Sequence, residues 1–432
     1  MFPVIITSKF TSRYSPIGPV VLVVLFLYSS ATEGRTSIPD PIAAPQEFAE
    51  WKTDVRVRLS SLLGIPDHGS RVNLHPQDRG SIERDGLVIE KWVYTLEQGS
   101  KMPALLYRPA KPRGLMPAVV LAYGHGASKS HASYQYIAQL YARLGIAVLA
   151  GDPIGEEERH IRGLIGTRDH DGAQVHRRAA DAGRSIMGKL VLDTMRGVDF
   201  LSSREDIDPS RIGVVGNSLG GAVAAWLAAL EPRIGFALIS GWGYGAHFES
   251  IGKQCTREPI RQMREQVSWM QFIALSAPHS NILILNGEAD IVIDKKEERA
   301  VWRDLQGLVE SVKPMQAAFS RSWSIDSWLI NGGGHRPYPA HPKGVAWILD
   351  QTKPRGDGAR ELPLSKTVNF GDWADGQGIQ FESLYDTELH LRGAVLVAGK
   401  INYLSPTVLQ VLTESEQGLP TFTLDGWLDV IE

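Results

Sequence analysis

Apolar and polar residues alternate along most of the chain in two different rhythms. Short unbroken runs of Val, Ile, Leu and Ala are typical of strands buried on both faces. Apolar residues spaced three and four apart indicate helices with one buried side. These patterns predict strands at 86–96, 102–107, 117–123, 146–150, 212–215, 234–239, 281–285 and 328–330, and helices at 45–63, 133–144, 185–201, 222–230 and 295–312.

The alternation of buried strands with helices from residue 117 onward predicts the fold class. Such an order is typical of an α/β protein, in which helices cover both faces of a mostly parallel sheet. Two stretches carry neither rhythm, and we interpret residues 154–184 as a polar loop and 241–278 as a variable segment.

The first residues of the chain have the organisation of an export signal. Lys9 and Arg13 supply positive charge, an apolar run follows, and small residues end it at Ala31. The apolar run is too short to span a bilayer comfortably, so we expect a signal peptide that is cleaved rather than a permanent anchor. The sequence therefore predicts a secreted or periplasmic protein, which would contact a membrane only through an uncleaved signal.

The last part of the chain differs in composition from the alternating body. Charge, glycine and proline collect at 354–364, as in a linker, and short strand-like runs follow at 378–381 and 394–398. An extension this short would be only marginally stable as an independent domain. We therefore expect it to pack on the main core. The predicted organisation is a signal peptide at 1–31, a mobile spacer at 32–44, one large α/β domain at 45–352, and a linker with a C-terminal extension at 353–432.

Composition excludes several classes of function. The net charge of −3 provides no basic footprint for nucleic acid. The single cysteine, Cys255, excludes an intramolecular disulfide and a cysteine-rich metal site. The glycine-rich stretch 213–221 lacks both G-x-G-x-x-G and a Gly-Lys-Ser/Thr ending, so it is neither a dinucleotide loop nor a P-loop. We expect no cofactor.

The stretch Gly216-Asn217-Ser218-Leu219-Gly220 has the G-x-S-x-G form of a nucleophile elbow. It lies between a predicted strand and a predicted helix. A turn this tight holds the serine in a strained conformation with its hydroxyl exposed, and the flanking glycines avoid collisions with strand and helix. We interpret Ser218 as a nucleophile; the alternative is a glycine-rich turn with an incidental serine.

A serine nucleophile needs a base and an acid that orients the base, and in such sheets both follow the serine in the order acid, then histidine. The strand predicted at 281–285 ends in a turn at Gly287, and Asp290 follows in the loop. We expect Asp290 to be the orienting carboxylate. Glu288 and Asp294 are neighbours that could take this role, and a solvated acidic loop is the remaining alternative.

The predicted base is His335, which follows a late strand through the glycines at 332–334. This flexible approach would let an imidazole reach the serine, and its ordinary pKa near neutrality suits a general base. His341 is the competing histidine, and an exposed turn is the structural alternative.

The oxyanion formed during attack needs backbone N–H donors. We expect one from Leu219, directly after the nucleophile, and one from the loop after the strand at 117–123, where the N–H of His125 is preferred over that of Gly126. The alternative roles for the His125 side chain are a metal ligand or a general base.

The charged loop after the strand at 146–150 should lie at the edge of the sheet where ligands gather. Glu158 and Arg159 in this loop are candidates for contacting substrate, and a solvated loop is the alternative. We predict no metal, because spacings typical of a metal site are absent among the histidines and acids that follow: His160, Asp169, His170, Asp171 and His176.

Taken together, these motifs resemble the α/β-hydrolase superfamily, most strongly secreted proteins similar to acetyl xylan esterases and dienelactone hydrolases. The resemblance covers about residues 85–350 and rests on Gly124-His125-Gly126, Asp152-Pro153-Ile154-Gly155 with Glu158-Arg159, 208–221, Ala277-Pro278 and Gly334-His335. It implies a triad of Ser218, Asp290 and His335, a carboxylic ester as substrate, a covalent acyl-enzyme and no cofactor.

The leading hypothesis is therefore a secreted serine esterase that cleaves small acyl esters, with acetylated carbohydrate among the expected substrates. Its partners would be small-molecule or carbohydrate esters rather than nucleic acid, and the oligomeric state stays open. Two alternatives remain: a serine peptidase of the same fold and a non-catalytic binding protein.

Overall fold

A computed structural model describes residues 37–249, 254–294, 299–319, 322–355, 364–379 and 394–432. The predicted signal peptide, the start of the spacer and much of the linker lie outside the described residues. The chain divides into two units, 1–36 and 37–432, and the second unit contains all the elements below. Within the described ranges, no helix has the length and apolar character needed to cross a membrane.

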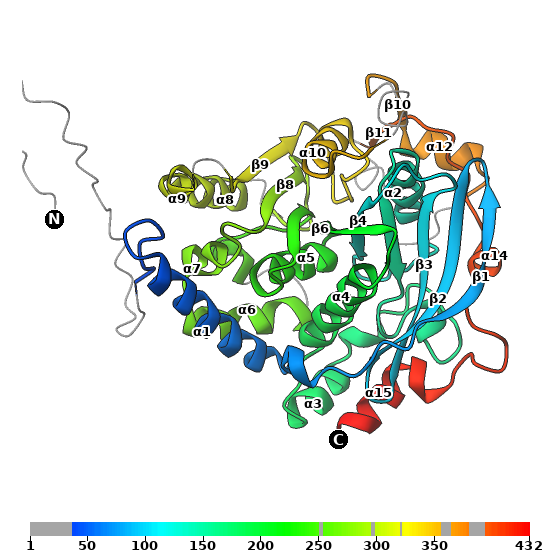
Figure 1. The fold of residues 1–432 in the computed structure, drawn as a ribbon, viewed down its shortest axis with the longest axis horizontal. Helices are drawn as coiled ribbons and strands as arrows, with labels where there is room; N and C mark the ends of the chain where they lie inside the picture. Colours follow the sequence, from blue (N-terminus) through cyan, green and yellow to red (C-terminus); the bar gives the residue numbers. More distant parts are fainter. Residues whose placement is uncertain (1–36, 250–253, 295–298, 320–321, 356–363, 380–393) are drawn as a thin grey trace, which may run out of the picture. The chain divides into compact units, whose positions relative to one another are not determined.

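The centre of this unit is a nine-stranded sheet with the order β1-β2-β3-β5-β4-β6-β7-β8-β9 (Figure 1). The pairs β1–β2, β2–β3 and β3–β5 are antiparallel, and all pairs from β5 to β9 are parallel. Its strands are β1 (Gln77–Arg84), β2 (Leu87–Glu97), β3 (Ser100–Pro109), β4 (Met116–Ala122), β5 (Ala147–Gly151), β6 (Ile207–Asn217), β7 (Ile234–Ser240), β8 (Asn281–Gly287) and β9 (Ile325–Ile330). The predicted fold class, a mostly parallel sheet with helices around it, is confirmed.

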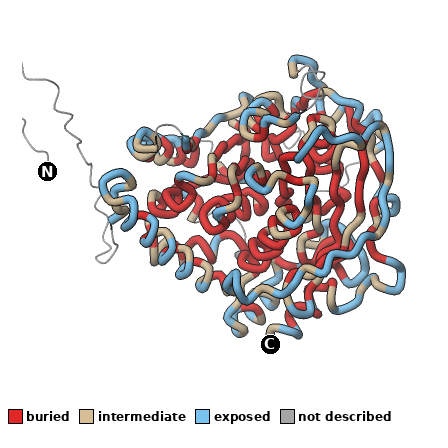
Figure 2. Tube along the Cα trace, viewed as in Figure 1, coloured by how far each residue is buried: buried red, intermediate tan, exposed pale blue. Residues whose placement is uncertain are grey.

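Each central strand is apolar on both faces because helices cover both. In β4, Val120 belongs to one hydrophobic cluster and Val119 and Leu121 to the other. The same alternation of two residues repeats in β8, with Ile284 and Leu285 on opposite faces. Figure 2 shows the strands and inner helices as a continuous buried interior. This explains why the strands read as unbroken apolar runs in the sequence.

The helices form two layers, one on each hydrophobic cluster. On the first lie α1 (Pro45–Leu63), α4 (Ile186–Ser202), α5 (Leu219–Leu230), α6 (Gln254–Gln266), α7 (Trp269–Ala274) and α8 (Ala300–Ser311). On the second lie α2 (Ala132–Arg143) and α10 (Pro342–Thr352). The short helices α3 (Ala173–Asp181) and α9 (Lys313–Ala318) complete the main body.

Two stretches without an apolar rhythm nevertheless contain helices. The predicted polar loop at 154–184 includes α3, of which only Ala179 is buried, so the helix leaves no apolar stripe in the sequence. The variable segment at 241–278 includes α6 and α7. Strand β1 was not predicted either, since it lies at the sheet edge and has no fully buried residue.

The C-terminal extension contributes to both hydrophobic clusters. It contains β10 (Thr367–Asn369), α12 (Phe370–Gly376), β11 (Val395–Val397), α14 (Pro406–Leu409) and α15 (Leu424–Ile431), of which β10 and β11 pair antiparallel. Trp427 belongs to the first cluster and Trp373 to the second. The run predicted at 394–398 forms β11, whereas in the run predicted at 378–381 residues 378 and 379 form no strand and residues 380 and 381 lie outside the described residues.

Polar side chains of α2 also hold the extension. The Gln135 amide donates to the carbonyl of Leu404 at 2.8 Å and accepts from its N–H at 3.0 Å, as a neighbouring strand would. The Tyr136 hydroxyl donates to the carbonyl of Val397 at 2.8 Å. These contacts join residues far apart in sequence. Side chains of the main body thus provide hydrogen-bond partners for backbone groups of the extension at Val397 and Leu404.

Candidate active site

Ser218 lies between the end of β6 and the first residue of α5, with φ 57° and ψ −118°. This backbone conformation is strained for a residue with a side chain, as the elbow motif predicts. The flanking glycines permit it: a Cβ on Gly216 would lie 2.0 Å from the carbonyl oxygen of Gly220, and one on Gly220 would lie 2.1 Å from that of Ala122. Strand β6 and helix α5 therefore approach closely enough to hold the serine in the turn.

His335 and Asp290 form a buried hydrogen-bonded pair. The His335 Nδ1 atom lies 2.7 Å from Asp290 Oδ2, and both residues are more than nine-tenths buried. The other carboxylate oxygen accepts from the N–H groups of Val292 at 3.0 Å and Ile293 at 3.2 Å. The carboxylate is thus fixed by its own loop, and it selects the tautomer in which Nδ1 carries the proton and Nε2 can act as a base.

The pair follows β8 and β9, and β7 lies between these two strands and the elbow strand β6. The Ser218 N–H donates to the carbonyl of Ser240, the last residue of β7, at 2.9 Å. A Cβ built on the next residue, Gly241, would lie 2.7 Å from His335 Cε1 and 2.8 Å from Asn217 Oδ1. The imidazole therefore lies against the backbone that holds the serine, and a side chain at position 241 would collide with it.

Two of the competing residues, His341 and Glu288, have other partners. Burial, followed by the charge of Lys343, lowers the pKa of His341 to about 4, and its Nδ1 accepts from the Lys343 N–H at the start of α10. Glu288 forms an ion pair with Arg299 at 2.6 Å. His341 and Glu288 thus serve a helix cap and a surface pair, and the geometry favours His335 and Asp290 for the acid–base roles.

The expected oxyanion donors come from two elements. Leu219 is the first residue of α5, where backbone N–H groups have no intrahelical partner. In the loop after β4, the Gly124 N–H donates to the Tyr134 hydroxyl at 2.8 Å and the Ala127 N–H to the Gly124 carbonyl at 3.1 Å. These two bonds fix the turn that carries His125, whose N–H remains the predicted second donor.

Glu158 and Arg159, predicted to contact substrate, are buried among protein partners. Arg159 has no exposed surface and pairs with Asp193 at 2.7 Å. Glu158 accepts from the N–H groups of Val411 at 2.9 Å and Leu412 at 2.6 Å. Both side chains therefore hold the protein together, and their contacts give no support to a role in substrate binding.

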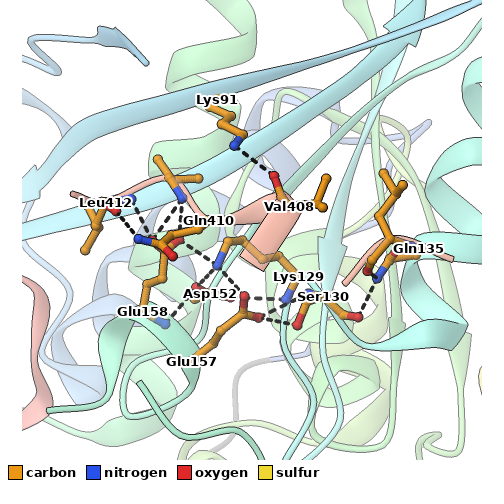
Figure 3. Close-up of polar contacts among 12 residues, drawn as sticks. Lys91, Lys129, Ser130, Gln135, Asp152, Glu157, Glu158, Val408, Gln410 and Leu412 are labelled. Carbon is orange, nitrogen blue, oxygen red and sulfur yellow. Dashed lines mark hydrogen bonds and ion pairs between the residues drawn. The ribbon is translucent and has the colours of Figure 1, made fainter. Parts of the chain in front are cut away.

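The loop that carries them also holds a buried charge cluster that sequence reasoning missed (Figure 3). The Lys129 Nζ atom lies 2.5 Å from Asp152, 2.7 Å from Glu157 and 2.8 Å from Glu158. Burial alone would lower the pKa of Lys129, but these carboxylates raise it well above its usual value. Burial and the Glu157 charge raise the pKa of Asp152. Only the acids were visible as a motif, because Lys129 looks like an ordinary surface residue in the sequence.

The histidines and acids that follow the loop are divided by the structure into two groups. His160 pairs with Asp169 at 3.0 Å. The ring of His170 instead stacks on that of His125 at 5.7 Å, and the His125 Nε2 atom lies 2.9 Å from the Cys255 sulfur. This second group could not be predicted from sequence spacing, since its members come from separate loops and helices.

The topology and the elbow together define the class: the chain has an α/β-hydrolase fold, with the serine turn between a central parallel strand and its helix. Over residues 71–274 it matches the model of the acetyl xylan esterase family (AXE1). The chain is thus similar to the acetyl xylan esterases, as the sequence motifs indicated.

One relative in sequence is YtaP of Bacillus subtilis (strain 168), a protein assigned as a hydrolase. It is 29% identical over 195 residues, which are 42% of this chain and 62% of the length of YtaP.

Solved structures of esterases share the fold at low sequence identity. Methylesterase BT1017 has a TM-score of 0.55 at 17% identity, covering 87% of this chain and 71% of its own. A glucuronoyl esterase from Solibacter usitatus has a TM-score of 0.52 at 13% identity, covering 74% and 96%. BF1801 from Bacteroides fragilis NCTC 9343, assigned as an acetyl xylan esterase, has a TM-score of 0.51 at 17% identity, covering 66% and 76%.

Proposed function

We propose that the protein is a serine esterase that hydrolyses carboxylic esters through Ser218, His335 and Asp290. The observation that carries this proposal is the buried His335–Asp290 pair, 2.7 Å apart, with the imidazole against Gly241, the residue that follows the Ser240 carbonyl to which the Ser218 N–H donates. The similarity to the acetyl xylan esterase family over residues 71–274 supports a carboxylic ester as substrate. We extend the proposal to small acyl groups on carbohydrate.

The proposed mechanism assigns one role to each of these residues. His335 Nε2 takes the hydroxyl proton as the Ser218 Oγ attacks the ester carbonyl, and Asp290 stabilises the imidazolium that forms. The N–H groups of Leu219 and His125 stabilise the oxyanion. His335 then gives the proton to the leaving alcohol, and water, activated by the same imidazole, releases the acid from the acyl-enzyme. No cofactor takes part in these steps.

The export prediction belongs to the same proposal. An enzyme for carbohydrate esters would meet polymeric substrate outside the cytoplasm, and the organisation of residues 1–31 is that of a cleaved signal. N-terminal sequencing of protein from the medium or periplasm of the host should find the mature chain beginning near Thr32. An intact N-terminus on intracellular protein would contradict export.

The esterase assignment is tested with purified protein on a p-nitrophenyl ester series and on acetylated xylan. We expect hydrolysis that is fastest with the acetyl ester and that is lost in Ser218→Ala. Hydrolysis of peptide anilides alone would favour a peptidase of the same fold. An inert wild-type protein that is correctly folded would favour a binding protein.

A further inference from the structure

Three potential metal ligands, one of them His125 from the loop after β4, form a cluster. The ligand atoms of His125, Asp171 and Cys255 all lie within 4.8 Å of one another. They come from the loop after β4, from the short 3-10 turn Asp169–Asp171, and from the first turn of α6. The sequence predicted no metal from spacing alone, but the fold brings together residues that are separated by long stretches of chain.

The three donors converge on one point. The sulfur of Cys255 lies 2.9 Å from His125 Nε2, and Asp171 Oδ1 lies 3.9 Å from the same nitrogen. Bond lengths of zinc to sulfur, nitrogen and oxygen would separate tetrahedral ligand atoms by about 3.4–3.6 Å. The two distances to His125 Nε2 would each have to change by about 0.5–0.7 Å to accommodate an ion between these atoms.

The same geometry argues against a second nucleophilic centre. In a Cys-His-Asp triad the acid and the thiol bind opposite ring nitrogens of the histidine. Here both approach Nε2, and Cys255 has no exposed surface through which a substrate could reach it. The arrangement is that of ligands around a shared centre rather than a relay.

Unused hydrogen-bonding capacity around the cluster points to a ligand. Within the described part of the chain, the buried His176 Nε2 atom has no hydrogen-bond partner. The buried Asp171 Oδ1 atom makes no hydrogen bond of normal geometry among the same residues, and its polar neighbours are the Cys255 thiol and the His125 ring. Buried polar atoms are normally satisfied, so these two atoms are consistent with an ion or its bound water.

We propose that His125, Asp171 and Cys255 bind one borderline divalent transition-metal ion, of which Zn²⁺ is the representative. A thiolate and an imidazole disfavour Mg²⁺ and Ca²⁺, which prefer oxygen ligands. Three protein ligands leave a position for water. The ion would connect three separate segments of the chain and so stabilise the loop that carries the proposed oxyanion donor.

Metal uptake is measured on chelator-treated, reduced, full-length protein. Cobalt(II), used as the spectroscopic probe, should give a thiolate-to-cobalt charge-transfer band that saturates at one equivalent, and Zn²⁺ should displace it and raise the melting temperature. Cys255→Ser should abolish the band, and both Cys255→Ser and Asp171→Asn should weaken Zn²⁺ binding by at least about tenfold. Two variants are needed in case one fails to fold.

His160→Gln is the matched control, since this neighbouring histidine pairs with Asp169 outside the cluster. It should bind Zn²⁺ like the wild type. Ser218→Ala should also bind normally, which separates this proposal from the proposed esterase activity. Absence of saturable uptake by folded wild-type protein would overturn the site, and so would uptake that is unchanged in both ligand variants.

Discussion

Two buried polar regions lie at the carboxyl edge of the same sheet, and their charged groups have different kinds of partner. At the ends of β6 to β9, one hydrogen-bonded pair, His335 and Asp290, lies beside a strained serine. At the ends of β4 and β5, Lys129 is enclosed by three carboxylates. We assign catalysis to the first region. In the second, the backbone N–H groups of Val411 and Leu412 in the C-terminal extension donate to Glu158.

The comparison teaches that a polar residue at this edge need not face a ligand, because the carboxylates around Lys129 are paired within the protein. Parallel strands bring every following loop to one edge, so a sequence argument places all of these acids near the site. What separates the regions is whether the charges are already satisfied by the protein. Substitutions in the two regions should therefore differ in their effects on activity and on stability.

The largest effect is expected from Ser218→Ala. Removing the nucleophile should lower kcat/KM for p-nitrophenyl acetate by at least about 10⁴-fold while leaving the urea unfolding midpoint nearly unchanged. Ser210→Ala, an exposed serine in the same strand β6, is the control and should keep full activity. Equal activity of both variants would remove Ser218 from the mechanism.

The first region could be predicted from sequence because each part of it has a local signature. The elbow is five consecutive residues, and Asp290 and His335 each follow a strand at a place fixed by the fold. The strands themselves were visible because burial on both faces produces continuous apolar runs.

The second region had no such signature. Glu158 looks like a loop acid, and its partners are backbone N–H groups about 250 residues later, which any residue type could supply. Lys129 differs from a surface lysine only in its surroundings. Likewise β1 and α3 were missed, because they are stabilised by edge pairing and by local backbone bonds rather than by an apolar stripe.

The next largest effect is expected from Lys129→Met, which leaves three carboxylates without their cation. Loss of one partner from a buried ion cluster should lower the free energy of unfolding by about 3–5 kcal/mol. The folded-state pKa of Lys129 is raised, so its stabilisation is complete below about pH 10.4 and is lost only as the pH rises through the folded value.

The loss of unfolding free energy in Lys129→Met should therefore be as large at pH 9 as at pH 7, as measured by urea unfolding at both pH values. Lys101→Met, a partly exposed lysine on β3, is the control and should change stability by less than about 0.5 kcal/mol. Similar deficits for both variants would show that the charge cluster does not stabilise the fold.

A smaller loss is expected from Gly220→Ala in the elbow. The new methyl carbon would lie 2.1 Å from the backbone oxygen of Ala122, so strand and helix must separate, at a cost of about 3 kcal/mol in unfolding free energy. Gly235→Ala in β7 is the matched control, because its methyl would meet nothing closer than 3.7 Å. We expect both activity and stability to fall in Gly220→Ala. In Gly235→Ala we expect both to stay at the wild-type level.

The smallest effect is expected from Glu158→Gln, which tests the contact between the two regions of the chain most directly. The amide keeps one acceptor oxygen but removes the charge that binds Lys129 and two backbone N–H groups, so unfolding free energy should fall by about 2 kcal/mol. Hydrogen exchange should accelerate at Val411 and Leu412 while the amides of β6 stay protected.

Catalysis distinguishes a structural Glu158 from one that contacts substrate. If the side chain only holds the extension, KM for acetyl esters should stay within about twofold of the wild-type value, because no contact with substrate is lost. An increase in KM of tenfold or more, with the hydrogen exchange of Val411 unchanged, would instead show that Glu158 contacts substrate. KM and the hydrogen exchange of Val411 together therefore decide whether Glu158, at the ends of β4 and β5, contacts substrate or only stabilises the fold.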